Sequence, residues 1–179
     1  PLAVAIRTKA EYAIFEMLVE ADPSITQKRD IRGRYPLHRA LELQCSDLKI
    51  IKLLCTCPEA VSEGYSRGLN ALLLGLTQYP VNPEIVEIIL QTAPESVRAT
   101  GGINRQTPLE VCYHRYTSTI RNMNSRERQT GRNFNSEARR EVERWWNVLV
   151  MVLKLVTTTG EDDSEWSILR AALSTDAPS

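Results

Sequence analysis

Apolar residues recur along the chain at the three- and four-residue spacing that places side chains on one face of a helix. The spacing is clearest in three groups: Ile14, Phe15, Leu18 and Val19; Ile50, Ile51, Leu53 and Leu54; and Val86, Ile89 and Leu90. These groups predict helices over residues 9–21, 47–55 and 83–91. Further helices are predicted over residues 1–8, 37–44, 71–77, 108–115 and 136–156. The pattern therefore predicts an all-α protein.

The predicted helices belong to a repeated pattern. Pro-Leu or Ala-Leu pairs place a leucine at intervals of 35, 35 and 37 residues, at Leu2, Leu37, Leu72 and Leu109. Prolines that follow the second helix of a pair lie 35 and 36 residues apart, at Pro23, Pro58 and Pro94. Because two independent landmarks share one period, the sequence indicates stacked units of two antiparallel helices. The units begin near residues 1, 36, 71, 108 and 168.

The segments that join these units are predicted to be outward turns. Residues 22–35 form the first of them, and Gly33 permits a turn with positive φ before the next helix. Two residues mark the starts of second helices. Asp47 suits the positive N-terminal end of its helix, and Pro83 suits a first helical position, where a missing N–H is not required.

One segment resembles a known family. Residues 33–40, Gly-Arg-Tyr-Pro-Leu-His-Arg-Ala, are similar to the Gly-x-Thr-Pro-Leu-His-x-Ala core of an ankyrin repeat. The resemblance covers residues 1–114, and 137–173 with more departures. It implies a single ankyrin-type solenoid of paired antiparallel helices with finger loops over residues 1–179. Tyr35 replaces the family's threonine and only His38 occupies the histidine position, so the family's hydrogen-bond network is expected to be missing from most units.

The fourth unit contains an insertion of about 25 residues, because Leu169, the next landmark, lies 60 residues after Leu109. Residues 116–135 are rich in Arg, Asn, Ser and Thr and are predicted to form a polar, mobile loop. From residue 115 to residue 140 there are seven arginines against two glutamates. This excess makes the insert a candidate for contact with nucleic acid or an acidic protein. Only Tyr116 and Phe134 offer rings for base stacking.

Composition bears on nucleic-acid binding, on cellular compartment and on membrane spanning. The 22 basic and 22 acidic residues balance, which gives no bulk attraction to nucleic acid. The four cysteines lie on or beside predicted helices in a chain too long to need a disulfide framework, which predicts an intracellular protein in the cytoplasm or, alternatively, the nucleus. Asn147 and Lys154 interrupt the longest apolar run, so no membrane span is predicted. Because Pro1 falls within a unit, we expect a piece of a longer protein.

Motifs for catalysis and for cofactor binding are absent from the sequence. The eight glycines form neither a phosphate-binding loop nor a dinucleotide fingerprint. His38 lies in the repeat core, and Cys112 beside His114 in sequence does not by itself make a catalytic pair. The two thiols of Cys55-Thr-Cys57 are half of a tetrahedral zinc site without a second pair nearby. We therefore predict a protein that is not an enzyme, with no metal, no cofactor and no small-molecule substrate.

The distribution of charge points to a binding surface. The finger loops carry seven basic residues against two acidic ones, whereas glutamates gather on the second helices. The resemblance to ankyrin repeats implies that fingers and first helices line a concave, ligand-binding surface. Tyrosines in the fingers would add aromatic contact area. The candidate partner-binding residues are Lys28, Arg29, Arg32, Arg34, Tyr35, Tyr65, Arg67, Arg98 and Arg105.

The leading hypothesis is a non-enzymatic protein–protein interaction scaffold, because a basic surface attracts an acidic segment of a partner protein. One alternative is a nucleic-acid or acidic-surface binder that works through the arginine-rich insert. Another is a regulatory repeat module of a larger enzyme or channel. A solvated basic fringe without a partner also accounts for the charge of the fingers.

Overall fold

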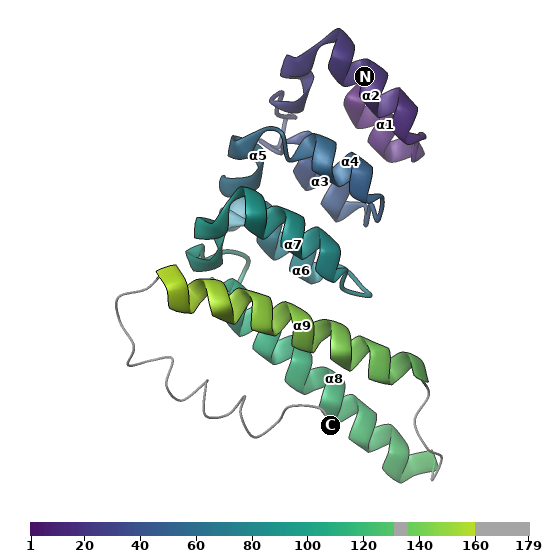
Figure 1. The fold of residues 1–179 in the computed structure, drawn as a ribbon, viewed down its shortest axis with the longest axis vertical. Helices are drawn as coiled ribbons and strands as arrows, with labels where there is room; N and C mark the ends of the chain where they lie inside the picture. The colour runs from purple at the N-terminus through teal and green to yellow at the C-terminus, as the bar shows by residue number, and fades with distance from the viewer. Residues whose placement is uncertain (131–135, 160–179) are drawn as a thin grey trace.

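The computed structural model describes residues 1–130 and 136–159 (Figure 1). Within these residues the regular elements are helices, and the extended pairings are two isolated β-bridges. The eight longest helices are α1 (Leu2–Thr8), α2 (Tyr12–Ala21), α3 (Pro36–Glu42), α4 (Leu48–Leu54), α6 (Ala71–Thr77), α7 (Pro83–Thr92), α8 (Pro108–Thr130) and α9 (Ser136–Thr159). The apolar spacing predicted α1 to α4, α6 and α7 to within three residues at each end, and the all-α class is confirmed.

The long helices form four pairs that stack along the longest axis of the molecule (Figure 1). The first helices contact one another in the order α1, α3, α6 and α8, and the second helices in the order α2, α4, α7 and α9. The molecule therefore has two helical layers. Each pair covers its apolar side chains mainly with the pair before it and the pair after it, and one apolar core runs through the stack.

Side chains at the helix starts explain why the chain turns where it does. The Asp47 carboxylate accepts hydrogen bonds from the backbone N–H groups of Lys49 (2.9 Å) and Ile50 (3.3 Å), which α4 itself cannot satisfy. Asn70 and Asn82 cap α6 and α7 in the same way. Helix α8 begins with a capping box, since Thr107 and Glu110 each accept the other's backbone N–H through their side chains.

A short helix follows each of the first three pairs, where the sequence pattern predicted only a turn. These are η1 (Pro23–Thr26), α5 (Pro58–Ser62) and η3 (Pro94–Arg98). Each begins at one of the regularly spaced prolines, because proline at a first helical position loses no hydrogen bond. The second and third residues after each proline are buried: Ile25, Thr26, Ala60, Val61, Ser96 and Val97. The unit therefore has three helical elements, and the interpretation of 22–35 as an uninterrupted loop is wrong.

A tight turn then leads from each short helix to the next pair. The turns cover residues 30–34, 65–69 and 101–106, with backbone hydrogen bonds between the first and last residue of each. The second turn contains the single 3₁₀ turn η2 (Ser66–Gly68). It touches the third turn, because the Gly102 N–H donates to the Arg67 carbonyl oxygen at 3.0 Å. A Cβ atom on Gly101 would clash with the backbone carbonyl oxygen of Gly68 in the second turn, so this close approach requires glycine.

Helix α8 is longer than the sequence pattern predicted. It continues to Thr130, so the prediction of a loop over residues 116–135 is wrong for residues 116–130; residues 131–135 lie outside the described part. The physical reason is an apolar stripe that packs on the core beside α9, formed by Cys112, Tyr116, Ile120 and Met123. The long pair α8–α9 is visible at the lower end of Figure 1. The predicted fifth unit, from residue 168, also lies outside the described residues.

Position in the stack decides which predicted apolar residues are buried. Ile89 and Val86 on the interior helix α7 are fully covered. On α2, which has a neighbouring pair on one side only, Phe15 is buried but Ile14 remains 45% exposed. Ile14 therefore belongs to the apolar face that the spacing predicted for this helix but is not buried, because α2 has a neighbouring pair on one side only.

Candidate functional site

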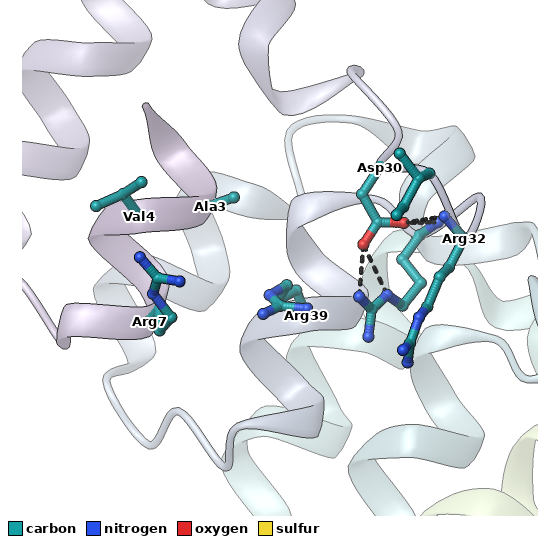
Figure 2. Close-up of a pocket in the computed structure, with 8 residues that line it drawn as sticks. Ala3, Val4, Arg7, Asp30, Arg32 and Arg39 are labelled. Carbon is teal, nitrogen blue, oxygen red and sulfur yellow. Dashed lines mark hydrogen bonds and ion pairs between the residues drawn. The ribbon is translucent and has the colours of Figure 1, made fainter.

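An open cavity of about 540 Å³ lies where α1, the 30–34 turn and α3 meet (Figure 2). We refer to it as the arginine cavity. Its lining residues are Ala3, Val4 and Arg7 of α1, Asp30, Ile31, Arg32 and Arg34 of the turn, and Arg39 of α3. Four arginines and one aspartate therefore line a single hollow. Its charge at neutral pH depends on how these groups are paired.

The Arg34 side chain is paired with carboxylates and stabilises the turn. Its guanidinium lies 2.6 Å from Asp30 Oδ2 and 2.6 Å from Glu42 Oε2, and only 9% of its side chain is exposed. Partial burial opposes ionisation of Asp30, but hydrogen bonds from the Arg34 side chain and from the backbone N–H groups of Arg34 and Arg32 outweigh it and lower the pKa of Asp30 to about 2. The turn is thus held by a charged pair that stays ionised at neutral pH.

The other three arginines of the cavity keep their positive charge uncompensated. Among the described residues, Arg7, Arg32 and Arg39 have no carboxylate within ion-pair distance. The Nε atom of Arg39 is buried and has no hydrogen-bond partner in the part of the chain that the structure describes. Figure 2 shows Arg39 between Arg7 on α1 and Asp30 on the turn. Since Asp30 is already paired with Arg34, the arginine cavity is cationic.

Apolar side chains stand beside this charge. Val4, on the exposed side of α1, is 51% exposed, and Ile31, at the tip of the turn, is fully exposed. An exposed isoleucine alone needs no explanation, but two apolar side chains around a cationic hollow resemble the mixture of apolar and polar contacts in protein interfaces. The cavity can hold an anionic group and an apolar group at the same time.

Both predicted aromatic anchors lie inside a polar network between the first two turns. Tyr35 is buried; its hydroxyl oxygen accepts a hydrogen bond from Arg29 at 2.7 Å, and the guanidinium lies 4.3 Å from the ring centroid. Arg29 also forms an ion pair with Glu63. The Tyr65 hydroxyl donates a hydrogen bond to Glu42. Burial is the larger cause and this hydrogen bond the smaller cause of a raised pKa of Tyr65. These side chains join neighbouring units.

The structure therefore divides the nine predicted residues into two groups. Those engaged with side chains of the protein are Lys28, which pairs with Asp22 at 2.6 Å, together with Arg29, Arg34, Tyr35 and Tyr65. Those exposed without a carboxylate partner in the described ranges are Arg32, Arg67, Arg98 and Arg105. The second group can meet a partner without first breaking an ion pair.

Arg7 and Arg39 are the residues that the sequence analysis missed. They lie on first helices, whereas the basic residues predicted to bind a partner all lie in the finger loops. The repeat register held a signal: Val4 and Arg39 both stand two residues after the landmark leucine of their unit, and Arg7 stands five after it. In a helix these offsets do not lie on the same face as the buried landmark. They therefore mark the outward side of the first helices.

The described part of the chain gives little support to a catalytic site, a metal site or a membrane-spanning helix. His38 and Cys112 are completely buried, and no group of three or more His, Cys, Asp or Glu side chains gathers as a metal site would require. All four cysteines are free thiols. None of the described helices combines the length and apolar character needed to cross a membrane.

Comparison with known proteins does not assign this chain to a family. No family model matches the chain, and the searches of curated proteins and of solved structures likewise give no match. The function of this chain is therefore inferred from the repeat pattern, the stacked helix pairs and the geometry of the arginine cavity.

Proposed function

We propose that this chain is an ankyrin-type repeat protein that acts as a non-enzymatic scaffold and binds an acidic segment of a protein partner. The binding face is formed by the first helices and the three turns. The observation that carries the proposal is the set of cationic side chains on this face that have no carboxylate partner within the described residues: Arg7, Arg32, Arg39, Arg67 and Arg105.

Three features support the ankyrin-type assignment. The units contain antiparallel helix pairs that stack in register, first helix on first helix and second on second. A tight turn precedes the first helix of the second, third and fourth units at intervals of 35 and 36 residues, at 30–34, 65–69 and 101–106. The segment around Pro36 and His38 carries the family-like core. The third, short helix after each pair lengthens the unit and agrees with its period of about 35 residues.

The charges on the two layers support the choice of face. Glutamates on the second-helix layer are exposed at Glu16, Glu20, Glu84 and Glu87. The first-helix and turn side instead carries the arginines listed above. An acidic segment is attracted to the arginines of the turn side and repelled by the glutamates of α2 and α7, which favours docking on the turn side.

Charge reversal on the proposed face tests the function. The variant Arg32→Glu/Arg67→Glu/Arg105→Glu is expected to bind a fluorescent poly-glutamate peptide at least about tenfold more weakly than wild type, measured by fluorescence anisotropy. All three side chains are exposed, so the melting temperature should change little. The binding of wild type should also weaken as salt is raised, because the charges are exposed to solvent.

The matched control is Lys49→Glu/Lys52→Glu/Lys154→Glu, which makes the same change in net charge on exposed residues of the second-helix layer. Its affinity for the peptide should stay within about threefold of wild type, because these lysines lie outside the proposed face. Equal weakening in both variants, or no binding of the acidic peptide by wild type, would contradict the proposal.

The alternative of nucleic-acid binding through the arginine-rich segment is less well supported. Tyr116, one of its two aromatic residues, is buried and lies with its ring centroid 5.5 Å from that of Trp146. A ring held in the core is not available to stack on a base. Single-stranded DNA in the same assay gives the direct comparison, and preference for DNA over the peptide would favour this alternative.

A further inference from the structure

The arginine cavity offers more than the general positive charge of the turn face. Arg7, Arg32 and Arg39 come from three separate elements and line one hollow. Their convergence on a cavity, rather than on an open loop, limits which part of a partner can reach all of them. A side chain inserted between α1 and α3 meets Arg7 and Arg39 together.

We propose, on the basis of the function proposed above, that the arginine cavity anchors the partner by binding one carboxylate side chain between Arg39 and Arg7 and an adjacent apolar side chain against Val4 and Ile31. The partner's recognised element is thus a short peptide in which an acidic residue stands next to an aliphatic one. The turns that follow add weaker electrostatic contacts along the stack.

Arg39 is the strongest part of the anchor. A guanidinium presents its donors in a planar fork that matches the two oxygens of a carboxylate. Its Nε–H is buried and without an acceptor among the described residues, so this donor gains a hydrogen bond when the guanidinium turns toward an arriving carboxylate. Most buried donors of folded proteins are paired, so an unpaired one that lines a cavity points to a ligand.

Asp30 does not compete for these arginines. Its Oδ1 atom accepts hydrogen bonds from the backbone N–H groups of Arg32 and Arg34, at 2.9 and 3.0 Å. Its Oδ2 atom accepts from the side chain of Arg34, and Glu42 pairs with the same guanidinium. The two carboxylates near the cavity are therefore occupied by Arg34. An incoming carboxylate meets positive charge that no group of the turn has neutralised.

The apolar walls indicate a peptide rather than a nucleic acid. Val4 and Ile31 flank the arginines, and the aliphatic stems of the arginines extend the apolar surface between them. No aromatic side chain is among the lining residues, so the cavity lacks the platform on which unpaired bases stack. An aliphatic side chain next to a carboxylate fits both parts of the wall.

Synthetic peptides test the anchor. The probe is a fluorescent peptide of alternating Glu and Leu, and the comparison peptides replace Glu by Gln or Leu by Ser. By fluorescence anisotropy, wild type should bind the Glu–Leu peptide at least about tenfold more tightly than either comparison peptide. The cavity variant Arg7→Glu/Arg39→Gln should lose about tenfold or more in affinity for it.

The comparison variant is Arg67→Glu/Arg105→Gln, which makes the same change in charge on the later turns of the binding face; it should weaken binding clearly less than the cavity variant, because these arginines add only the weaker electrostatic contacts. Ile31→Ser should weaken binding of the Glu–Leu peptide but leave the Glu–Ser peptide unaffected. Melting temperatures separate lost binding from lost folding. Because Arg39 is half-buried, Arg7→Glu alone, at an exposed position, serves as the second cavity variant.

The outcomes separate the anchor from the general function. If the cavity variant and the comparison variant weaken binding equally, the anchor is overturned while the basic face remains. If wild type binds none of the acidic peptides, the proposed function fails as well. If the Glu–Ser and Glu–Leu peptides bind equally, the apolar part is wrong. Displacement of the bound peptide by equimolar single-stranded DNA would overturn the assignment to a peptide partner.

Discussion

His38 shows how a residue from a recognisable motif can have a role set by its surroundings. Its ring lies between those of Tyr35 and Tyr65, with centroids 5.6 and 5.0 Å away. The side chain is completely buried. Burial lowers its pKa from 6.5 to about 4, although the nearby backbone of Ala60 and the negative charge of Glu42 act in the opposite direction. The folded protein therefore favours the neutral imidazole.

The free energy of unfolding should depend on pH through this histidine. The unfolded chain takes up a proton as pH falls through 6.5, whereas the folded chain does so only near pH 4. Stability contributed by the neutral ring is thus present above pH 6.5 and decreases as pH falls toward 4, by about 3 kcal/mol in all. Urea unfolding at a series of pH values measures this loss.

The variant His38→Gln provides the control for this pH dependence. It should be less stable at pH 7 but should have a flatter dependence between pH 6.5 and 5, where few other groups of ordinary pKa titrate. Asp30, with its pKa near 2, adds a loss of stability only below about pH 4. An unchanged slope in the variant between pH 6.5 and 5 would assign the effect to other groups.

At the scale of the helix, equal spacing in the sequence does not mean equal burial. Ile14 on α2 and Ile89 on α7 both belong to clear apolar stripes. Helix α7 has a pair on each side, whereas α2 is at the end of the described stack. The energetic weight of an apolar position therefore depends on how many neighbours its helix has.

Alanine substitution at these two positions measures the difference. Ile89→Ala should lower the free energy of unfolding by about 2–5 kcal/mol, because it removes a fully buried side chain that contacts the α6 helix around Gly75. Ile14→Ala should cost about 0.5 kcal/mol, since the residue is nearly half exposed. Denaturant melts give both values, and similar losses in the two variants would mean that another surface covers α2.

Helix α8 shows that the structure of a segment rich in polar residues also depends on its neighbours. Residues 116–130 contain many polar side chains, yet Tyr116, Ile120 and Met123 follow Cys112 at intervals of four, four and three residues. Such a stripe is sufficient for a helix when a partner is available to cover it. Helix α9 provides that partner, with Trp145, Val148, Leu149 and Val152 buried.

At the scale of the whole molecule, contacts run mainly between neighbouring pairs. The first pair contacts α3, α4 and η1, and the later pairs extend the stack in the same way. Stability in such an array is close to a sum of units and of the interfaces between neighbours. The pairs further along the chain should therefore fold without the first one.

A chain that begins at residue 22, and so lacks α1 and α2, tests this expectation. It should keep a cooperative thermal transition by circular dichroism, at a lower melting temperature, because the interface with α3 and α4 is lost. Removal of α1 also removes Arg7 and Val4, so affinity for the Glu–Leu peptide should fall as in the cavity variant. A broad, non-cooperative loss of helix would show that the first pair is required for the whole stack.

The amino-acid sequence by itself determined the local features of this protein. The helices α1 to α4, α6 and α7, the place of Asp47 at the start of α4 and the start of α7 at Pro83 follow from periodicity, local charge and proline geometry within a few residues of chain. The period of about 35 residues also needs no structure to be seen. These properties are predictable because their causes lie close together in sequence.

Only the tertiary structure decided which charges are free and which segments are covered. Arg29 is paired with Glu63, 34 residues further along the chain, and Arg34 is paired with Glu42, 8 residues further, as well as with Asp30 of its own turn. The full pairing of either arginine therefore cannot be judged from its own turn. Arg7 and Arg39, from different units, line one cavity because α1 stacks on α3. Pairing and burial depend on distances in space between residues that are remote in sequence, and no local pattern encodes them.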